Sequence, residues 1–398
     1  MSQTTTNIYN NVNYALHLHT DAIARLQEQV STGARINRAS DDPSAAYNIL
    51  TLSSQERSLQ NYIDNLSDVI DAMGLSSAIV GNITSYLAQV KSTITQVISG
   101  TYDQQTRERT AEGIDDILEQ IVSLANTKRM NQYIFGGADT ASAPYVIERT
   151  NGEITGVTYQ GSSDGRDIEV SPGLKASASY VGNDIFSSSD RGDPVFMGTT
   201  GAKAGTGTSS VRGDVWLTVI NDGANFKLSI DDGASYVTVP AGGDTNQAVT
   251  DSRTGQVLYI DTTEINSTGV ELVRIPGTYD VFSTLISIRD ILKNKKNLSD
   301  AQLRQLQDSC LSSLDEVRNL MTQDSVSIGS KIGFLDDLKE SLNNLKFNAE
   351  DETARLQDAD IAQIAIDLSR RQALYQLSLS VAARIMSMSL FDFISTSA

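Results

Sequence analysis

Two long stretches of the chain contain no proline, and they lie at its two ends, at residues 44–143 and 277–398. All but one of the six prolines fall between residues 144 and 276, and the exception is Pro43. Proline breaks a helix because it lacks an amide donor and its ring clashes with the preceding turn. The sequence therefore allows long helices at both ends and indicates a middle that is built differently.

Composition excludes several classes of protein. The net charge of the 398 residues is −18, which argues against nucleic acid as a partner and gives no attraction to an anionic membrane. No uncharged apolar run reaches the ~18 residues that a membrane-spanning helix needs. The first residues form no basic and then apolar leader, so we expect no cleavable signal peptide. The one cysteine, Cys310, cannot form an intrachain disulfide, and we predict a buried structural thiol.

The inner parts of the two proline-free stretches carry regular apolar stripes. Apolar residues recur every three or four positions from Leu59 to Val97, a spacing of about 3.5 residues that is typical of packed helices. Further stripes occupy residues 114–124, 303–317 and 328–349. We expect these helices to pack within their own molecule as a self-sufficient helical core.

The extreme ends carry stripes that need a partner. A free helix of this size is marginal in water, because the conformational entropy lost on ordering its backbone outweighs the free energy gained by burying one apolar seam. The partner is either the other terminus or other copies of the chain. We therefore hypothesise that both ends are poorly ordered in the monomer and fold on assembly. The seam positions singled out as subunit-interface residues are Ile8, Val12, Ala15, Leu26, Ile361, Ile364, Leu368, Leu379, Met386, Leu390 and Phe393.

A short joint separates the first stripe from the long one and reads S-T-G-A-R-I-N-R-A-S-D-D-P-S-A-A over residues 31–46. Gly33 is suited to end a helix, since glycine adopts left-handed backbone angles without penalty. Asp42 followed by Pro43 is a strong helix start, because the carboxylate accepts orphan amides and proline fits the first position. The residues alone predict a helix–turn–helix joint.

As a complete string, this joint closely resembles the one near the N-terminus of bacterial flagellins and flagellin-like junction proteins. The C-terminal string S-L-F-D-F-I at residues 389–394 resembles the closing string of the same superfamily. The resemblance covers roughly residues 1–137 and 279–398.

Several shorter strings are similar to the branch of that superfamily that joins the flagellar hook to the filament. Where flagellins typically read T-x-F-N-G, this chain reads N-Q-Y-I-F-G-G-A-D-T over residues 131–140. Pro144-Tyr145, Tyr159-Gln160-Gly161, Asp184-Ile185-Phe186 and Tyr279-Asp280-Val281-Phe282 accompany it.

The middle of the chain, residues 138–278, is rich in glycine, serine, threonine and aspartate. Alternating runs at 214–220 and 226–230 predict strands, and N-D-G at 221–223 and D-D-G at 231–233 predict turns. We expect a β domain with two parts divided at the glycine-rich residues 198–207.

The predicted fold class is mainly α with an inserted β domain, in which the N- and C-terminal helices pair as a coiled coil or helical bundle. Residues 1–38 with 357–398 would form a terminal coiled-coil segment, and residues 39–137 with 279–356 a helical core. Residues 138–278 would form a β-rich outer insert.

No residue pattern indicates catalysis, a cofactor or a metal site. His17 and His19 are two positions apart on a helix and point to different faces, so they form a poor metal pair. The sequence has no H-E-x-x-H motif and no glycine-rich phosphate loop after a strand. We expect no enzyme activity.

The resemblance implies a structural subunit of the extracellular flagellum that self-assembles as a ring at the hook–filament junction. It also implies export, unfolded, by the type III apparatus after masking by a cytoplasmic flagellar export chaperone. Its neighbours would be the first hook-associated protein and flagellin. Arg35, Arg38 and Asp41 would bridge subunits at the joint, while helix capping suffices for Asp42. The alternatives are flagellin itself and a secreted adhesin-like protein that binds through the β insert.

Overall fold

The structure is a computed structural model that describes residues 2–99 and 103–396. The chain forms two compact units, Met1–Asp64 with Lys339–Ala398 and Asn65–Leu338. We call them the terminal unit and the central unit, and each is described by itself. Helices α2 (Pro43–Ser99) and α6 (Asp300–Gln357) contribute to both.

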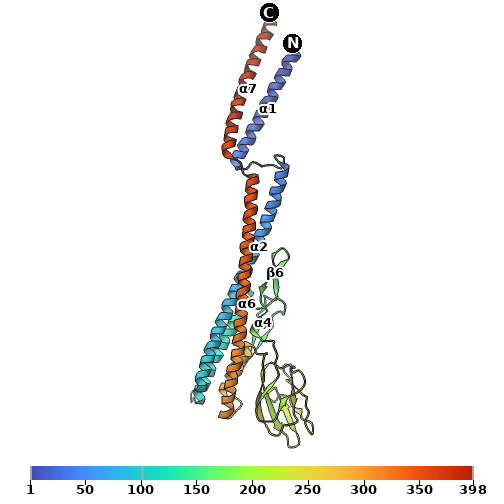
Figure 1. Cartoon of the computed structure of the whole chain (residues 1–398), viewed down its shortest axis with the longest axis vertical. Coiled ribbons are helices and arrows are strands. Elements are labelled where there is room, and N and C mark those ends of the chain that lie inside the picture. The colour runs from blue at the N-terminus through green and yellow to red at the C-terminus, as the bar shows by residue number, and fades with distance from the viewer. Residues whose placement is uncertain (1, 100–102, 397–398) are drawn as a thin grey trace. The chain divides into compact units, whose positions relative to one another are not determined.

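In the terminal unit, the two ends of the chain pair with each other. Helix α1 (Ser2–Thr32) packs along α7 (Ile361–Thr396) (Figure 1). The unit also contains the start of α2 and the end of α6, where Thr353 donates a hydrogen bond to Glu56 at 2.7 Å. The predicted pairing of the N- and C-terminal helices is therefore confirmed.

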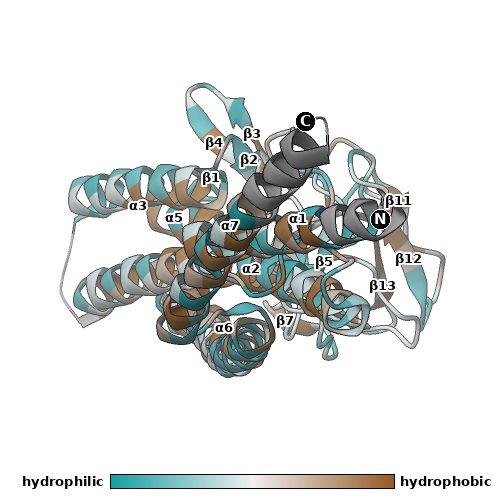
Figure 2. Cartoon of the chain, turned by 90° about the horizontal axis from the view of Figure 1, so that it is seen from above, coloured by the Kyte–Doolittle hydropathy of each residue, from teal (hydrophilic) through white to brown (hydrophobic). Residues whose placement is uncertain are grey.

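In the central unit, the helical core has the seam that the sequence predicts. Within this unit, the stripe of α2 is buried from Leu66 to Val97, and Ser76 lies in it with its hydroxyl donating to the carbonyl of Ala72. Lys91 of α2 forms an ion pair of 2.6 Å with Asp315 of the antiparallel α6. Helices α3 (Gln104–Ala125) and α5 (Val281–Lys293) pack through the hydrophobic sides that face each other (Figure 2).

The first part of the β region consists of three hairpins close to the helices. They are β1 (Lys128–Arg129) with β2 (Gln132–Tyr133), β3 (Tyr145–Thr150) with β4 (Glu153–Tyr159), and β5 (Arg166–Ser171) with β6 (Leu174–Ser179). A short helix, α4 (Gly182–Phe186), follows.

The second part of the β region is a β sandwich. Five strands lie in the order β11-β10-β9-β14-β7 and three in the order β12-β13-β8, all antiparallel to their neighbours. Both sheets contribute to one buried apolar cluster. The strand bounds are β7 Val195–Met197, β8 Lys203–Ala204, β9 Gly213–Asn221, β10 Phe226–Ser229, β11 Val237–Thr238, β12 Gln247–Thr250, β13 Val257–Asp261 and β14 Gly269–Ile275.

The strands and turns expected in the β sandwich are present. The alternating runs at 214–220 and 226–230 fall in β9 and β10. Asp222 accepts the amides of Ala224 and Asn225 in the turn between these strands, and Asp232 and Gly233 take positive φ angles in the next. With the long helices at both ends, these elements confirm the predicted fold class.

The division that we expected at residues 198–207 is wrong. These glycines lie inside the β sandwich, where a side chain on Gly198 would meet Glu271 and one on Gly201 would meet the carbonyl of Glu264. The glycines therefore serve close packing and do not form a linker. The two β parts are divided nearer residues 187–192, where Ser188 donates its amide to the carbonyl of Tyr279 and Gly192 donates to Pro276.

A buried polar cluster joins the β sandwich to α5. Asp214 of β9 accepts hydrogen bonds from the hydroxyls of Tyr279 (2.7 Å) and Ser287 (2.9 Å). Arg274 of β14 completes it, with its Nε donating to the Tyr279 hydroxyl at 2.8 Å. A buried carboxylate needs this degree of hydrogen bonding, so the cluster fixes how the sandwich meets the helix.

Cys310 lies on the buried face of α6, as predicted. Burial raises the pKa of its thiol, which keeps the group protonated and unreactive. Over the described residues, none of the helices has the length and apolar character needed to cross a membrane.

Candidate assembly site

The paired terminal helices present part of their predicted seam to each other and part to solvent. Ile364 is buried, while Ile361 and Leu379 are exposed on the same helix. Val12, Ala15, Leu26 and Leu368 are half-buried. The side chains of Ile8, Met386, Leu390 and Phe393 lie outside the described residues. Pairing within one chain therefore leaves apolar seam surface uncovered.

A second apolar face on α7 was missed by the sequence reasoning. Ile366 and Leu377 are 62% and 61% exposed, and Val381 extends the same face. Positions two apart on a helix lie about 200° from each other, so Leu377 points away from Leu379 and Ile366 away from Ile364. The signal in the sequence is the spacing of apolar residues at 366, 374, 377 and 381, which places them on one helix face. It was overlooked because the first seam was assumed to be the single apolar face of the helix.

Helix α1 and the start of α2 add further exposed apolar side chains. Tyr14 and Leu18 are exposed on α1, and Tyr47 and Leu50 on α2. Singly exposed apolar residues are ordinary, but helices with apolar residues on opposite faces indicate burial against further partners. The terminal unit thus has the character of an incomplete core.

A groove of about 470 Å³ lies between α1 and α7. Both helices contribute apolar and charged side chains to its lining. The lining residues are Ala22, Arg25, Leu26, Gln29, Asp367, Arg370, Arg371 and Leu374.

The joint is held by backbone hydrogen bonds between the two ends of the chain. Helix α1 ends at Thr32, and Gly33 takes a φ of 69°, as its predicted role as a helix stop requires. The amide of Arg35 donates to the carbonyl of Gln357 at 2.7 Å, and that of Ala359 donates to Gly33 at 2.9 Å. These two hydrogen bonds connect the residues after the C-terminal end of α1 to the residues before the N-terminal end of α7.

Carboxylates of the joint cap the helices that start there. Asp42 accepts the amide of Ala45 at 3.0 Å, so it caps α2 in front of Pro43, as predicted. Asp360 accepts the amide of Gln363 at 3.0 Å and caps α7 in the same way. Asp41 instead accepts the amide of Arg38 at 2.9 Å and closes the loop between α1 and α2.

The charged side chains of the joint have partners within their own chain. Arg38 pairs with Glu28 at 3.2 Å, Arg25 with Asp41 at 3.7 Å, and Arg35 lies 3.9 Å from Asp42. The three arginines are exposed, so each ion pair contributes little to stability. Bridging between subunits by Arg35, Arg38 and Asp41 stays a prediction.

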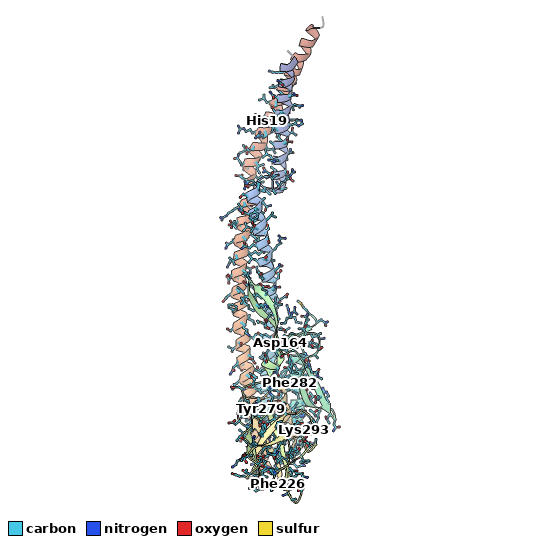
Figure 3. The ribbon with its side chains drawn as sticks, turned by 90° about the vertical axis from the view of Figure 1, so that its right-hand side faces the viewer. His19, Asp164, Phe226, Tyr279, Phe282 and Lys293 are labelled. Carbon is cyan, nitrogen blue, oxygen red and sulfur yellow. The ribbon has the colours of Figure 1, made fainter. Side chains whose placement is uncertain are left out.

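In the central unit, the shorter strings of the sequence meet in one aromatic cluster. Phe135, Tyr145, Phe186 and Phe282 come from four separate strings, and their ring centroids lie between 4.7 and 6.0 Å apart in neighbouring pairs. All four are buried. Figure 3 labels Phe282 and Tyr279 at the start of α5, where Asp280 caps the helix by accepting two amides.

Glycines allow the backbone to close around this aromatic cluster. The hydroxyl of Tyr159 donates to the carbonyl of Phe135, and the amide of Gly182 donates to the same carbonyl at 2.9 Å. Gly137 takes a φ of 64°, and a side chain there would meet two carbonyl oxygens within 2.7 Å. The Y-I-F-G-G string is therefore needed for packing at the root of the β region.

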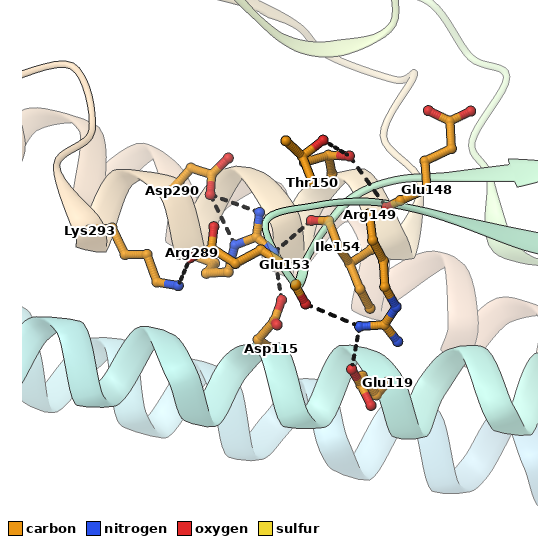
Figure 4. A network of polar contacts seen from close by, with 12 residues as sticks. Asp115, Glu119, Glu148, Arg149, Thr150, Glu153, Ile154, Arg289, Asp290 and Lys293 are labelled. Atoms are coloured by element: carbon orange, nitrogen blue, oxygen red, sulfur yellow. Dashed lines mark hydrogen bonds and ion pairs between the residues drawn. The ribbon is translucent and has the colours of Figure 1, made fainter.

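Arg289 of α5 anchors the β3–β4 hairpin to the helical core (Figure 4). Its side chain is fully buried and donates to Asp115 of α3 at 2.5 Å and to the carbonyl of Ile154 in β4 at 2.6 Å. At the rim of this network, Glu153 pairs with Lys293 at 2.8 Å and Lys295 at 2.6 Å. These two lysines lower the pKa of the Glu153 carboxyl to about 2.

Within the part of the chain that the structure describes, no three His, Cys, Asp or Glu side chains form a cluster able to hold a metal ion. In the terminal unit, α1 pairs with α7, and both helices keep apolar side chains exposed. The bacterial flagellin N-terminal helical region matches residues 4–140, which confirms the resemblance drawn from the joint.

Hook-associated proteins and flagellins are among the proteins to which the chain is similar. The chain is 27% identical over 162 residues to flagellar hook-associated protein 3 of Escherichia coli K12, which is 40% of this chain and 49% of that protein. It thus spans about half the length of that curated relative. Polar flagellin C of Vibrio parahaemolyticus is 21% identical over 390 residues, 93% of this chain and 92% of that one.

Solved structures of hook-associated protein 3 share the fold. The crystal structure from Legionella pneumophila superposes with a TM-score of 0.53 at 15% identity, covering 77% of this chain and 98% of that one. A structure described as the flagellar junction protein FlgL from the same organism gives 0.50 at 17% identity, covering 78% and 100%.

Proposed function

We propose that the chain is a structural subunit of the bacterial flagellum that forms the junction between hook and filament by self-assembly through its terminal helices. The observation that carries this proposal is the terminal unit. It combines a flagellin-type joint, an α1–α7 pair and apolar faces that one chain leaves uncovered. Such surfaces are buried by assembly.

The aromatic cluster supports the junction branch over flagellin. The strings that resemble junction proteins are separated by up to about 140 residues, yet their aromatic side chains pack on one another. Because these residues pack together, the departure from flagellin's T-x-F-N-G involves the whole cluster and not one isolated string. The similarity to hook-associated protein 3 in sequence and fold agrees with this reading.

The proposed export route, location and binding partners of the protein follow from that role. The chain is exported through the type III apparatus after a cytoplasmic chaperone has masked its C-terminal helix, and it acts outside the cell. There it binds further copies of itself, with the first hook-associated protein on one side and flagellin on the other. It has no catalytic function.

The proposed domains follow the same division of roles. Residues 1–38 with 357–398 order on assembly, residues 39–137 with 279–356 form the helical core, and residues 138–278 form an outer insert. Limited proteolysis of the monomer should trim roughly the first 40 and last 40 residues. Termini that resist the protease in the monomer would contradict folding on assembly.

Flagellin is the second candidate, because polar flagellin C matches almost the full chain. Deleting the gene separates the two. A junction protein should leave hooks intact and flagellin monomers shed into the medium, and restoring the gene should restore filaments. Hooks that still carry normal filaments after the deletion would exclude the junction role.

The role of the second apolar face can be tested with a matched pair of variants. Leu377→Asp places a charge on the exposed face of α7, whereas Leu174→Asp changes another exposed leucine in β6. Neither should alter the monomer by more than about 0.5 kcal/mol, since both positions are on the surface. Only Leu377→Asp should abolish filament attachment; equal loss in both variants would contradict the assignment.

A further inference from the structure

The β1–β2 hairpin of the central unit ends in an unusual tip. Met130 and Asn131 both have positive φ, at 49° and 65°, and the Met130 side chain is 78% exposed. Long side chains rarely adopt this left-handed conformation, in which glycine or asparagine is the ordinary choice. Here a strained position presents a large apolar side chain to solvent.

The hairpin is fixed on one side of α2. Arg129 forms ion pairs with Asp68 at 3.3 Å and Asp71 at 3.4 Å, both on α2. Lys91, which pairs with Asp315 of α6, lies 23 residues after Asp68 and 20 residues after Asp71 on α2. At about 100° per residue, it points to the opposite side of that helix. The tip and α6 therefore lie on opposite sides of α2.

Helix α6 carries an exposed apolar face in the same unit. Val326 is 67% and Phe334 59% exposed, and Gly333 lies beside Phe334 with open space where a side chain would be. Glycine inside an exposed helix costs about 1 kcal/mol relative to alanine. The face thus combines two uncovered apolar side chains with a glycine that has open space beside it.

The tip and this face are at the same level along the helices. Counting equal numbers of residues from the Lys91–Asp315 pair along antiparallel α2 and α6 places Asp68 and Asp71 level with residues 335–338. Phe334 and Asp337 of α6 therefore lie at about the same height as the two aspartates that hold the hairpin. Two copies side by side, without a shift along their helices, would bring the tip of one to this face of the next.

The charges beside the two surfaces are complementary. Lys128 belongs to the hairpin, two residues before Met130, and its ammonium is held 4.5 Å from the ring centroid of Tyr133. Asp337 is exposed one turn after Phe334 and on the same side of α6. A lysine next to the apolar tip can thus meet an acid next to the apolar face.

We propose that copies of the chain associate head to tail, with Met130 of one copy packed against Val326, Gly333 and Phe334 of the next and Lys128 facing Asp337. This deepens the proposed self-assembly and rests on it. A contact between two different surfaces repeats from copy to copy and closes into a ring when the rotation permits.

Cysteine crosslinking tests the contact. Met130→Cys and Phe334→Cys are combined in one chain, and flagella from cells making it are oxidised mildly; the native Cys310 is buried. The double variant should give dimers, trimers and higher multimers, because each copy offers one thiol to each neighbour. Each single variant should stay monomeric.

The outcomes separate the contact from the proposed function. Absence of multimers in flagella that contain the double variant would overturn the contact and leave the junction role intact. Absence of the wild-type protein from flagella would overturn both. Disulfide-linked dimers of either single variant would show that the surfaces meet in another arrangement, which also overturns the contact.

A pair of variants at the tip provides the matched control. Met130→Gly suits the φ of 49° and should not destabilise the hairpin, whereas it removes the apolar side chain. Burial of a methionine changes an equilibrium constant roughly tenfold to a hundredfold, so assembly should weaken by that factor. Met130→Leu should retain most of it. Equal assembly of the Gly and Leu variants would contradict the proposal.

Discussion

The fully buried Arg289 gives the sharpest stability prediction. Replacing it with methionine keeps most of the side-chain length but removes the donors to Asp115 and to the carbonyl of Ile154. The change leaves two acceptors between α3, α5 and the β3–β4 hairpin without their partner. It should therefore loosen the hairpin as well as lower the free energy of unfolding.

The expected magnitude follows from the exposure of the remaining groups. Breaking a buried ion pair by removing one partner costs about 3–5 kcal/mol. The Asp115 side chain is 18% exposed and that of Asp290 is 30% exposed, so water can partly replace the arginine. We therefore expect the free energy of unfolding to fall by about 2–4 kcal/mol, somewhat less than the cost for a fully buried pair.

The assay is urea unfolding of the full chain at neutral pH, with Arg149→Met as the matched control. Arg149 lies on the same hairpin and pairs with Glu119 at 2.8 Å, but both side chains are more than 40% exposed. That control should cost about 0–1 kcal/mol. If Arg289→Met is no more destabilising than Arg149→Met, the argument that burial makes the network stabilising is refuted.

Three further predictions concern single positions. Burial and the nearby Asp184 raise the pKa of the Asp324 carboxyl to about 6. The folded chain therefore prefers the neutral carboxyl and loses stability as the pH rises from about 4 through 6. Asp324→Asn should raise the melting temperature at pH 7.5 and not at pH 4. Gly277→Ala should prevent normal folding, because the new Cβ would clash with the carbonyl oxygen of Asp190. Gly255→Ala, also at positive φ but with open space, should cost only about 1–2 kcal/mol of stability, and equal expression and melting of the two variants would contradict this. Asp42→Ala should cost about 1 kcal/mol in thermal unfolding through the lost cap, and Asp42→Asn much less.

Local rules explain why the helical parts of the fold could be predicted from the sequence. Gly33 ends α1 and Asp42 caps α2, because each role depends only on the residue and its immediate neighbours. The same holds for the predicted strands that became β9 and β10. Seam burial in α2 followed from the spacing alone, since the helix repeat fixes which residues share a face.

Features that depend on distant contacts were not predictable. The glycines at 198–207 look like a linker in the sequence, and only Glu271 and Glu264 packed against them show otherwise. The second face of α7 was missed because residues between the stripe positions, such as Arg370, obscure it. The strings around Phe135 were recognised singly, but their meeting in one cluster requires the tertiary fold.

Where the protein sits on the flagellum is the most direct test of the central claim. Gold-labelled antibody against the chain can be imaged on hooks isolated from cells that lack flagellin, where the hook end is uncovered. The junction role predicts label confined to the distal end of each hook, in the absence of filament. Unlabelled hook ends, or label along the whole length of filaments in cells that make flagellin, would contradict it.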